Sequence, residues 1–180
     1  MVVNDMLNDK KVYPTELQES MLQEAVGLIR QRYGEDASVL GIYLSGSIVD
    51  RTFGEYEKPT HQDGEPRLGS DIDVMLVIKN RLNFLPLPDE DQKHYSVRHI
   101  GKKPDIPVYR MIDENGQDVF LRGKHPVEPM IVTEGLFEGW LSGKYKWGNE
   151  QSRPFPELVR EYIIVKETGQ LREIRERHVR

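Results

Sequence analysis

Two nearly continuous apolar runs dominate the pattern of hydrophobic and polar positions along this chain. They lie in "SVLGIYLSGS" at residues 38–47 and in "GSDIDVMLVI" at residues 69–78. Short apolar runs that are bounded by glycine, serine and aspartate are typical of buried strands. We therefore expect two central strands, the first ending at Gly46 and the second ending near Ile78.

A helical pattern precedes these strands in "YPTELQESMLQEAVGLIRQRYGED", residues 13–36. Its apolar residues recur every four positions, at Leu17, Met21, Ala25 and Ile29. Thr15 is the expected N-cap, and Gln18 three positions later would complete a capping box. Gly34 is expected to end the helix.

Several further segments have weaker patterns. Residues 54–69, "GEYEKPTHQDGEPRLG", are polar and rich in Gly and Pro. They predict a mobile loop that joins the two expected central strands and lies beside their facing ends. Residues 106–123 resemble a hairpin with Asn115-Gly116 at its turn. "HPVEPMIV" at 125–132 predicts a short strand, and Thr133 is expected to cap the helix after it.

The C-terminal part of the chain reads as helical. Residues 154–169, "PFPELVREYIIVKETG", are a helix candidate, and residues 170–180 predict a charged helix or a frayed end. With 180 residues the chain suits one domain over 1–180. We expect its core at about residues 15–145 and a helical segment at about 154–178.

Composition narrows the class of protein. Hydrophobic residues make up 37% and charged residues 31%, which is typical of a globular domain. No apolar run reaches the roughly 20 residues of a membrane-spanning helix, and the N-terminus lacks the apolar core of a signal peptide. The absence of cysteine excludes disulfides and thiolate sites and favours the cytoplasm. A net charge of −5 argues against general nucleic-acid binding.

Asp71 and Asp73 stand at the start of the second expected strand, where a carboxylate is costly to bury. Alternate residues of a strand share a face, so both aspartates point to one side, roughly 7 Å apart, and Ile72 points into the core. Carboxylate oxygens are the ligands that Mg²⁺ prefers, and Mg²⁺ usually keeps positions for substrate phosphates. An isolated Asp-x-Asp sequence has an ordinary structural explanation, in which Asp71 is a turn residue and Asp73 is an exposed charge at the edge of the sheet.

Gly46 and Ser47 follow the first expected strand directly. Backbone N–H groups and a hydroxyl at such a turn can bind a phosphate, and glycine lets the ligand approach closely. Gly-Ser alone is also an ordinary strand-to-helix turn. For the turn and the aspartates to form one site, the end of the first strand must meet the start of the second. The two strands must then run antiparallel.

Taken together, "LSGS" at 44–47 and "SDIDVMLVI" at 70–78 resemble the signature of the DNA polymerase β-like nucleotidyltransferase superfamily. That signature is a hydrophobic strand, Gly-Ser, and then Asp-hydrophobic-Asp on the next strand. The resemblance covers roughly residues 37–79, and the polar segment 54–69 makes the spacing longer than in small members. It implies an α+β fold with a mixed or antiparallel central sheet flanked by helices, as in the polymerase β palm.

The resemblance also implies which residues form the site. Asp71 and Asp73 would bind Mg²⁺ or Mn²⁺ together with the triphosphate of ATP or another nucleotide, and Gly46 and Ser47 would hold its phosphates. Arg51, close after Gly-Ser, is expected either to reach a phosphate or to form a surface salt bridge.

The family usually has a third acidic residue on a later strand. Glu128 is the best match because it lies in a short apolar strand followed by a capped helix. Asp105 and Asp118 compete for the same role. This third carboxylate would be a metal ligand or the base that deprotonates the acceptor.

The implied activity is transfer of a nucleoside monophosphate to an acceptor hydroxyl on a small molecule, a protein or an RNA end. Two metal ions would stabilise the attacking and leaving oxygens. One alternative is a non-catalytic nucleotide-binding or regulatory module. Another is an antitoxin-like nucleotidyltransferase that acts on a partner toxin. The five histidines show no metal-ligand spacing and are assigned no role.

Overall fold

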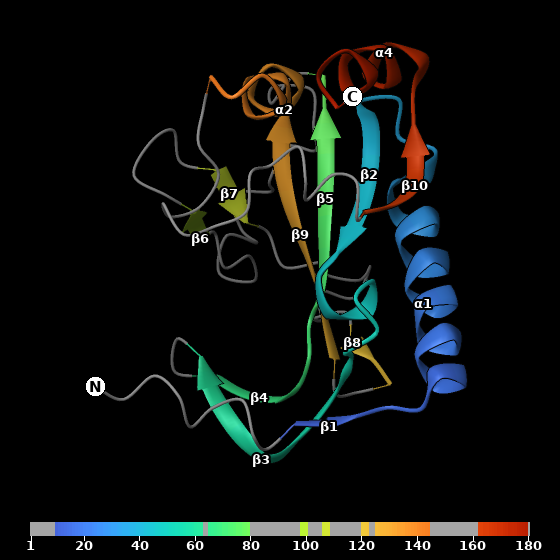
Figure 1. Cartoon of the computed structure of the whole chain (residues 1–180), viewed down its shortest axis with the longest axis vertical. Coiled ribbons are helices and arrows are strands. Elements are labelled where there is room, and N and C mark those ends of the chain that lie inside the picture. Colours follow the sequence, from blue (N-terminus) through green and yellow to red (C-terminus); the bar gives the residue numbers. More distant parts are fainter. Residues whose placement is uncertain are drawn as a thin grey trace, which may run out of the picture.

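The computed structural model describes residues 10–62, 65–79, 98–100, 106–108, 120–122, 125–144 and 162–179. Within these residues the strands form a larger and a smaller sheet, and the helices pack on the larger one (Figure 1). None of the described helices is long and apolar enough to cross a membrane.

The larger sheet is mixed. Its strands are β2 (Val39–Ser45), β5 (Ile72–Ile78), β6 (Arg98–Ile100), β7 (Ile106–Val108), β8 (Phe120–Leu121), β9 (His125–Thr133) and β10 (Ile163–Glu167). Their order is β10–β2–β5–β9–β7–β6, and β8 pairs with β9. Strand β5 is antiparallel to β2 and parallel to β9. The chain is therefore of the mixed α+β kind, as expected.

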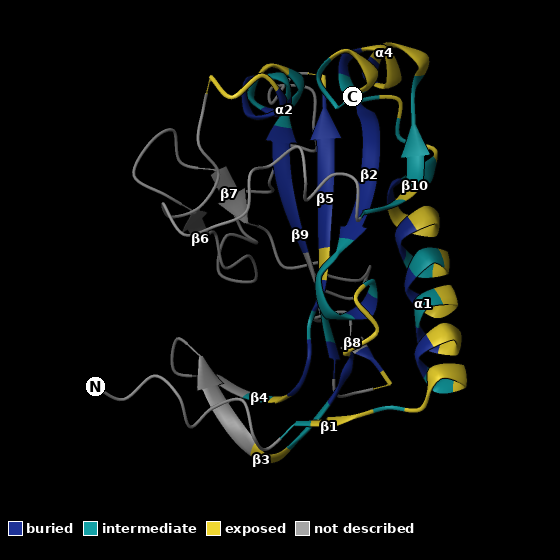
Figure 2. Cartoon of the chain, viewed as in Figure 1, coloured by how far each residue is buried: buried dark blue, intermediate teal, exposed yellow. Residues whose placement is uncertain are grey.

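The helices cover both faces of this sheet. They are α1 (Thr15–Ile29), which continues as a π-helical turn (Arg30–Gly34), α2 (Glu134–Leu141) and α4 (Gly169–His178). On one face Val74, Leu76 and Ile78 of β5 pack in the layer that contains α1. On the other face Met75 and Val77 pack in the layer that contains α2 and α4. Figure 2 shows the buried strands β2, β5 and β9 beside helices whose outer sides are exposed.

The start of α1 differs from the expected capping box. Pro14, not Thr15, holds the N-cap position, and no side chain caps the helix. Gln18 is buried instead, donating to the Tyr13 carbonyl at 2.7 Å and accepting from the Phe53 N–H at 3.2 Å. Its amide therefore ties the helix to the segment that enters the smaller sheet. The expected end near Gly34 and the Thr133 cap of α2 are both confirmed.

Residues 54–62 and 65–69 form strands, so the prediction of a loop over 54–69 is wrong. The smaller sheet has the order β1–β3–β4, with β1 at Lys10–Val12, β3 at Gly54–Gln62 and β4 at Glu65–Gly69. Polar residues and prolines dominate β3 and β4, so hydrophobic alternation gave no strand signal. The dipeptide Asp63-Gly64 between them is a typical hairpin signal and was the available clue.

The C-terminal helix prediction is wrong in its middle. Residues 163–167 form β10, which pairs antiparallel with β2 and places Ile163 opposite Leu44. The β-branched run of Ile163, Ile164 and Val165 favours a strand at a sheet edge. The helix expected after it is confirmed as α4, while residues 154–161 lie outside the described residues.

The prediction of a hairpin over 106–123 fails at the two ends that the structure describes, because β7 lies between β6 and β9 and does not pair with β8. Strands β7 and β8 each pair with β9, and the turn at Asn115-Gly116 lies outside the described residues.

Candidate functional site

The end of β2 meets the start of β5. The two strands run antiparallel, with Ser45 opposite Asp73 and Leu44 opposite Val74. The antiparallel arrangement expected from the sequence is thereby confirmed. It places the Gly46-Ser47 turn beside the first acidic residue within β5.

Gly46 and Asp73 approach each other closely. Gly46 has a φ of +73°, and a Cβ at this position would overlap the Asp73 carboxylate. The Gly46 carbonyl accepts hydrogen bonds from the amides of Val49 at 2.9 Å and Asp50 at 3.0 Å, which closes a short 3₁₀ turn. The carboxylate of Asp73 therefore lies directly over a well-defined turn of backbone.

The two aspartates have different surroundings. Ile72 between them is fully buried and Asp73 is exposed, which confirms the expected alternation. Asp71 accepts an ion-pair hydrogen bond from Arg67 of β4, with 2.7 Å between Nη1 and Oδ2. Burial lowers the pKa of Lys10, and the negative charge of Asp71 opposes that shift. Asp71 therefore lies in basic surroundings supplied by the smaller sheet.

Tyr162 reaches the same corner of the sheet from the residue before β10. Burial raises its pKa to about 12; a hydrogen bond with the Ser45 side chain opposes the shift, and the charge of Asp73 adds to it. Its ring centroid lies 6.1 Å from that of Tyr43. Tyr162 is thus a neutral phenol within electrostatic reach of Asp73. Sequence patterns did not indicate Tyr162 as a site residue, because residues 154–169 have a pattern that predicts a helix.

His125 is a second residue near the site that sequence patterns did not indicate. It is 1% exposed, with Nδ1 2.7 Å from the Ser70 carbonyl oxygen and Nε2 3.0 Å from the Tyr13 hydroxyl. A Cβ at Gly69 would overlap its ring. These contacts fix residues 69–70, directly before Asp71. No local signal identifies such a histidine, because Ser70 and Tyr13 lie 55 and 112 positions away in the sequence.

Glu128 lies opposite Asp73 in the parallel pairing of β5 with β9, and Val127 lies opposite Ile72. The strand expected around Glu128 is confirmed. The position of its carboxylate lies outside what the structure describes, so its role stays a prediction. Asp105 and Asp118, the competing candidates, also lie outside the described residues.

Arg51 forms a surface ion pair. Its Nη1 lies 2.9 Å from Oε1 of Glu19 on α1, and the two side chains are 59% and 56% exposed. This is one of the two arrangements expected for Arg51. Contact with a phosphate stays a prediction.

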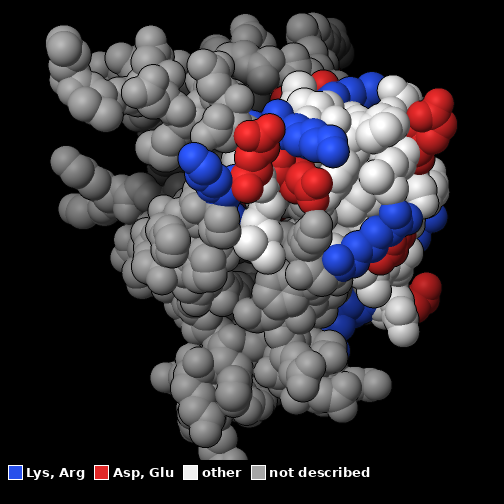
Figure 3. Space-filling model, turned by 90° about the horizontal axis from the view of Figure 1, so that it is seen from below, with Lys and Arg blue, Asp and Glu red and all other residues white. Residues whose placement is uncertain are grey.

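The donors that fit a divalent cation are carboxylate oxygens. Among the side chains that the structure describes, no group of three acidic, histidine or cysteine residues is arranged to hold a metal. Asp71 and Asp73 nevertheless supply hard oxygen ligands at the solvent-accessible start of β5, which suits Mg²⁺ or Mn²⁺. On the face shown in Figure 3, the basic and acidic side chains of the described residues lie interspersed, without a single basic patch.

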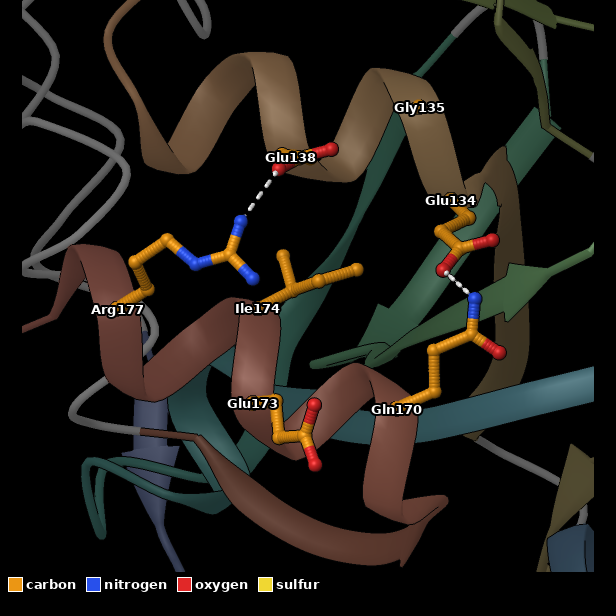
Figure 4. A pocket seen from close by; sticks show the side chains of 7 residues that line it. All are labelled: Glu134, Gly135, Glu138, Gln170, Glu173, Ile174 and Arg177. Atoms are coloured by element: carbon orange, nitrogen blue, oxygen red, sulfur yellow. Dashed lines mark hydrogen bonds and ion pairs between the residues drawn. The ribbon is translucent and has the colours of Figure 1, made fainter.

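A separate hollow of about 420 Å³ lies between α2 and α4 (Figure 4). Its charged lining includes Glu134, Glu138, Glu173 and Arg177. The pairing of β5 with β9 ends where Ile78 lies opposite Thr133, and α2 begins directly after Thr133. Helix α2 therefore lies at the opposite end of β5 from Asp73. The hollow is therefore distinct from the corner that holds the aspartates.

No protein-family model matches the chain, and no curated protein matches it. Its structure is similar to that of a nucleotidyltransferase-like protein from Exiguobacterium sibiricum, with 13% identity and a TM-score of 0.42. The match covers 87% of this chain and 38% of that protein, so the chain spans well under half of its length. A similarity of this degree establishes neither a common fold nor a common activity. Any function must therefore rest on the residues of the site.

Proposed function

We propose that this chain is a metal-dependent nucleotidyltransferase, which transfers a nucleoside monophosphate from ATP or another nucleoside triphosphate to an acceptor hydroxyl. The observation that carries the proposal is the pairing of Ser45 with Asp73. It sets the Gly46-Ser47 turn against an exposed carboxylate, with Asp71 two positions away along the chain. A phosphate-binding turn and a cation-binding acid pair then share one corner of the sheet.

Each residue has a role that its chemistry allows. Asp71 and Asp73 would hold Mg²⁺ or Mn²⁺ through carboxylate oxygens. When bound, such an ion neutralises phosphate charge and stabilises the attacking and leaving oxygens of an in-line displacement. Gly46, which has no side chain, leaves room for the Asp73 carboxylate beside the turn. Backbone N–H groups of the turn and the Ser47 hydroxyl would bind the phosphate.

Glu128 is the proposed third acid. Its register with Asp73 supports this role, because paired positions on neighbouring strands are the closest neighbours across a sheet. In the reaction Glu128 would accept the proton of the acceptor hydroxyl, directly or as a ligand beside the cation. The bond from that oxygen to the α-phosphorus then forms as the bond to pyrophosphate breaks. The acceptor is a small molecule, a protein side chain or an RNA end.

A labelling experiment tests the proposal. The protein is incubated with Mg²⁺, a cell extract and each α-³²P-labelled nucleoside triphosphate in turn, and labelled products are separated by size and class. We expect label in one acceptor with the wild type and none with Asp73→Asn. The matched control is Glu173→Gln, which changes an exposed acid at the far end of the sheet and should label like the wild type. Absence of label from all four nucleotides would contradict the transferase.

The ion pair of Arg67 with Asp71 favours a second candidate, a nucleotide-binding or regulatory module without catalysis. A carboxylate that already has a guanidinium partner does not require a cation. This candidate requires nucleotide binding that is independent of Mg²⁺ and unaccompanied by transfer. Equilibrium dialysis of labelled ATP with and without EDTA separates the two candidates.

A further inference from the structure

The two aspartates of the candidate site are held in place by different means. Asp73 lies within β5, and the pairing of that strand with β2 and β9 sets its position. Strand β4 ends at Gly69 and β5 begins at Ile72. Ser70 and Asp71 therefore lie in the connection between the two sheets. The position of Asp71 depends on the contacts that hold this connection.

Ser70 is held at both its N–H and its carbonyl group, and it is only 3% exposed. Its N–H donates to the Gly54 carbonyl at 2.8 Å, and its hydroxyl accepts from the Gly54 N–H at 3.3 Å. Its carbonyl oxygen lies 2.7 Å from Nδ1 of His125. A carbonyl oxygen can only accept, so Nδ1 carries a proton and donates it. His125 is therefore the side chain that orients the Ser70 carbonyl.

That carbonyl belongs to the peptide unit that leads into Asp71. A peptide unit is planar, so the direction of the Ser70 carbonyl also sets the direction of the Asp71 N–H and the position of the Asp71 Cα. A rotation of this unit would carry the Asp71 carboxylate with it. The hydrogen bond from His125 thus acts on Asp71 across a single rigid group of atoms.

The imidazole ring of His125 is itself held firmly. Its centroid lies 4.5 Å from that of Phe53 and 5.5 Å from that of Tyr13. With the proton on Nδ1, Nε2 of the neutral ring accepts from the Tyr13 hydroxyl at 3.0 Å. A Cβ at Gly69 would overlap the ring. The donor that faces Ser70 therefore has a defined position.

We propose that His125 is a positioning residue of the nucleotidyltransferase site, which sets the Asp71 carboxylate for the divalent cation through the Ser70 carbonyl. This inference rests on the proposed function. Mg²⁺ requires nearly ideal octahedral geometry and tolerates a displaced ligand poorly. Groups that orient metal ligands typically change metal affinity about 10–100-fold when they are removed. A residue that only fills space would affect stability, whichever of its nitrogens a substitution kept.

Two substitutions distinguish the two ring nitrogens. The amide nitrogen of asparagine stands as many bonds from the backbone as Nδ1, and that of glutamine stands as many as Nε2. His125→Asn can therefore still donate to Ser70, whereas His125→Gln keeps only the position that faces Tyr13. Tyr13→Phe is the matched control, because it removes the contact with Nε2 and leaves the contact with Ser70.

The experiment measures binding of Mn²⁺ in the presence of ATP, from the electron spin resonance signal of the free ion, and unfolding free energy by urea denaturation. We expect His125→Gln to bind Mn²⁺ with ATP about tenfold more weakly than the wild type. His125→Asn and Tyr13→Phe should bind within about twofold of the wild type, because both keep the hydrogen bond to Ser70. All three variants should lose stability, so stability alone does not separate them.

Two results would show that His125 only packs the junction between the sheets. One is a folded His125→Gln that binds Mn²⁺ with ATP as the wild type does. The other is an His125→Asn that loses as much affinity as His125→Gln. Either result removes this inference alone. If the wild type itself does not bind Mn²⁺ with ATP, the proposed function fails as well.

A measurement on the wild type replaces the glutamine variant if circular dichroism shows that the variant is unfolded. Nitrogen NMR of the histidine rings should find the proton of His125 on Nδ1. The Nδ1 resonance should shift when Mg²⁺ and ATP bind, because the Ser70 carbonyl connects it to Asp71. An unprotonated Nδ1, or an unchanged resonance in the protein saturated with both ligands, would overturn the inference.

Discussion

The Asp73 carboxylate lies so close to Gly46 that a side chain at position 46 would overlap it. This contact joins the turn after β2 to the acid at the start of β5. It exists because the antiparallel register puts Ser45 opposite Asp73 and because Gly46 adopts a φ of +73°. The contact turns two ordinary features, a Gly-Ser turn and a surface aspartate, into one candidate site.

Replacing Gly46 by alanine tests the closeness of this approach. We expect Gly46→Ala to lose most binding of ATP with Mn²⁺, because the methyl group displaces the Asp73 carboxylate. Backbone strain at positive φ should also reduce stability by about 1–2 kcal/mol. Both effects are measured on one sample, by urea denaturation and by titration of fluorescent ATP.

The matched control for this variant is Gly143→Ala. Gly143 has a similar φ of +74°, and a Cβ there would meet nothing within 4 Å. It should show the loss of stability without the loss of binding. Equal nucleotide binding by the two variants would show that the contact with Asp73 has no part in the site.

Replacing Glu128 by glutamine tests the third acid. The change removes a base and a charge but keeps the size of the side chain. We expect Glu128→Gln to bind ATP with Mn²⁺ as the wild type does and to lose transfer by about 100-fold or more, measured by the labelling assay. Undiminished transfer would assign the role to Asp105 or Asp118, which the same assay tests as asparagine variants.

Glu167 links β10 to α4 and gives the fold a pH dependence. Its side chain is 3% exposed and accepts from Arg175 at 2.7 and 3.1 Å and from the Tyr43 hydroxyl at 2.8 Å. Burial alone would raise the pKa of Glu167, but the hydrogen bonds from Arg175 and Tyr43 outweigh it and lower the pKa. The folded pKa is thus below the unfolded one. The stabilisation is full above the unfolded pKa, and it is lost as the pH falls through the folded pKa.

We therefore expect Glu167→Gln to lose about 3 kcal/mol of unfolding free energy at pH 7, because it breaks a buried ion pair. Its stability should also decline less steeply than that of the wild type on acidification. Urea denaturation from pH 7 to pH 3 measures both effects. Glu138→Gln is the control, because its pair with Arg177 is exposed and spans 3.6 Å, and should change stability by about 0.5 kcal/mol or less. Equal losses in the two variants would contradict the buried pair.

Local patterns were enough to predict the centre of this fold. The apolar runs of β2 and β5 are buried along nearly their whole length, and Ile72 is buried between two more exposed aspartates, as alternation requires. The motif that joins these strands also predicted their antiparallel contact. Each of these features depends on residues that are near one another in the sequence.

Features that depend on distant partners were missed. Residues 163–167 form strand β10 because they pair with β2. Their sequence alone predicts a helix. The ion pair of Arg67 with Asp71 depends on the hairpin, whose polar strands carry no hydrophobic signal. His125 contacts the Ser70 carbonyl and the Tyr13 hydroxyl, which lie near it only in the folded chain. Sequence patterns therefore identified the acidic pair but not its basic and aromatic surroundings.

The most direct measurement is the shift in Tm that Mg²⁺ or Mn²⁺ and ATP produce together, in the wild type and in the Asp71→Asn, Asp73→Asn double variant. A ligand that binds only the folded state raises Tm by mass action. We expect a clear rise for the wild type, little rise with ATP and EDTA, and loss of most of the rise in the double variant. An equal shift in the two proteins would contradict a cation and nucleotide site at Asp71 and Asp73.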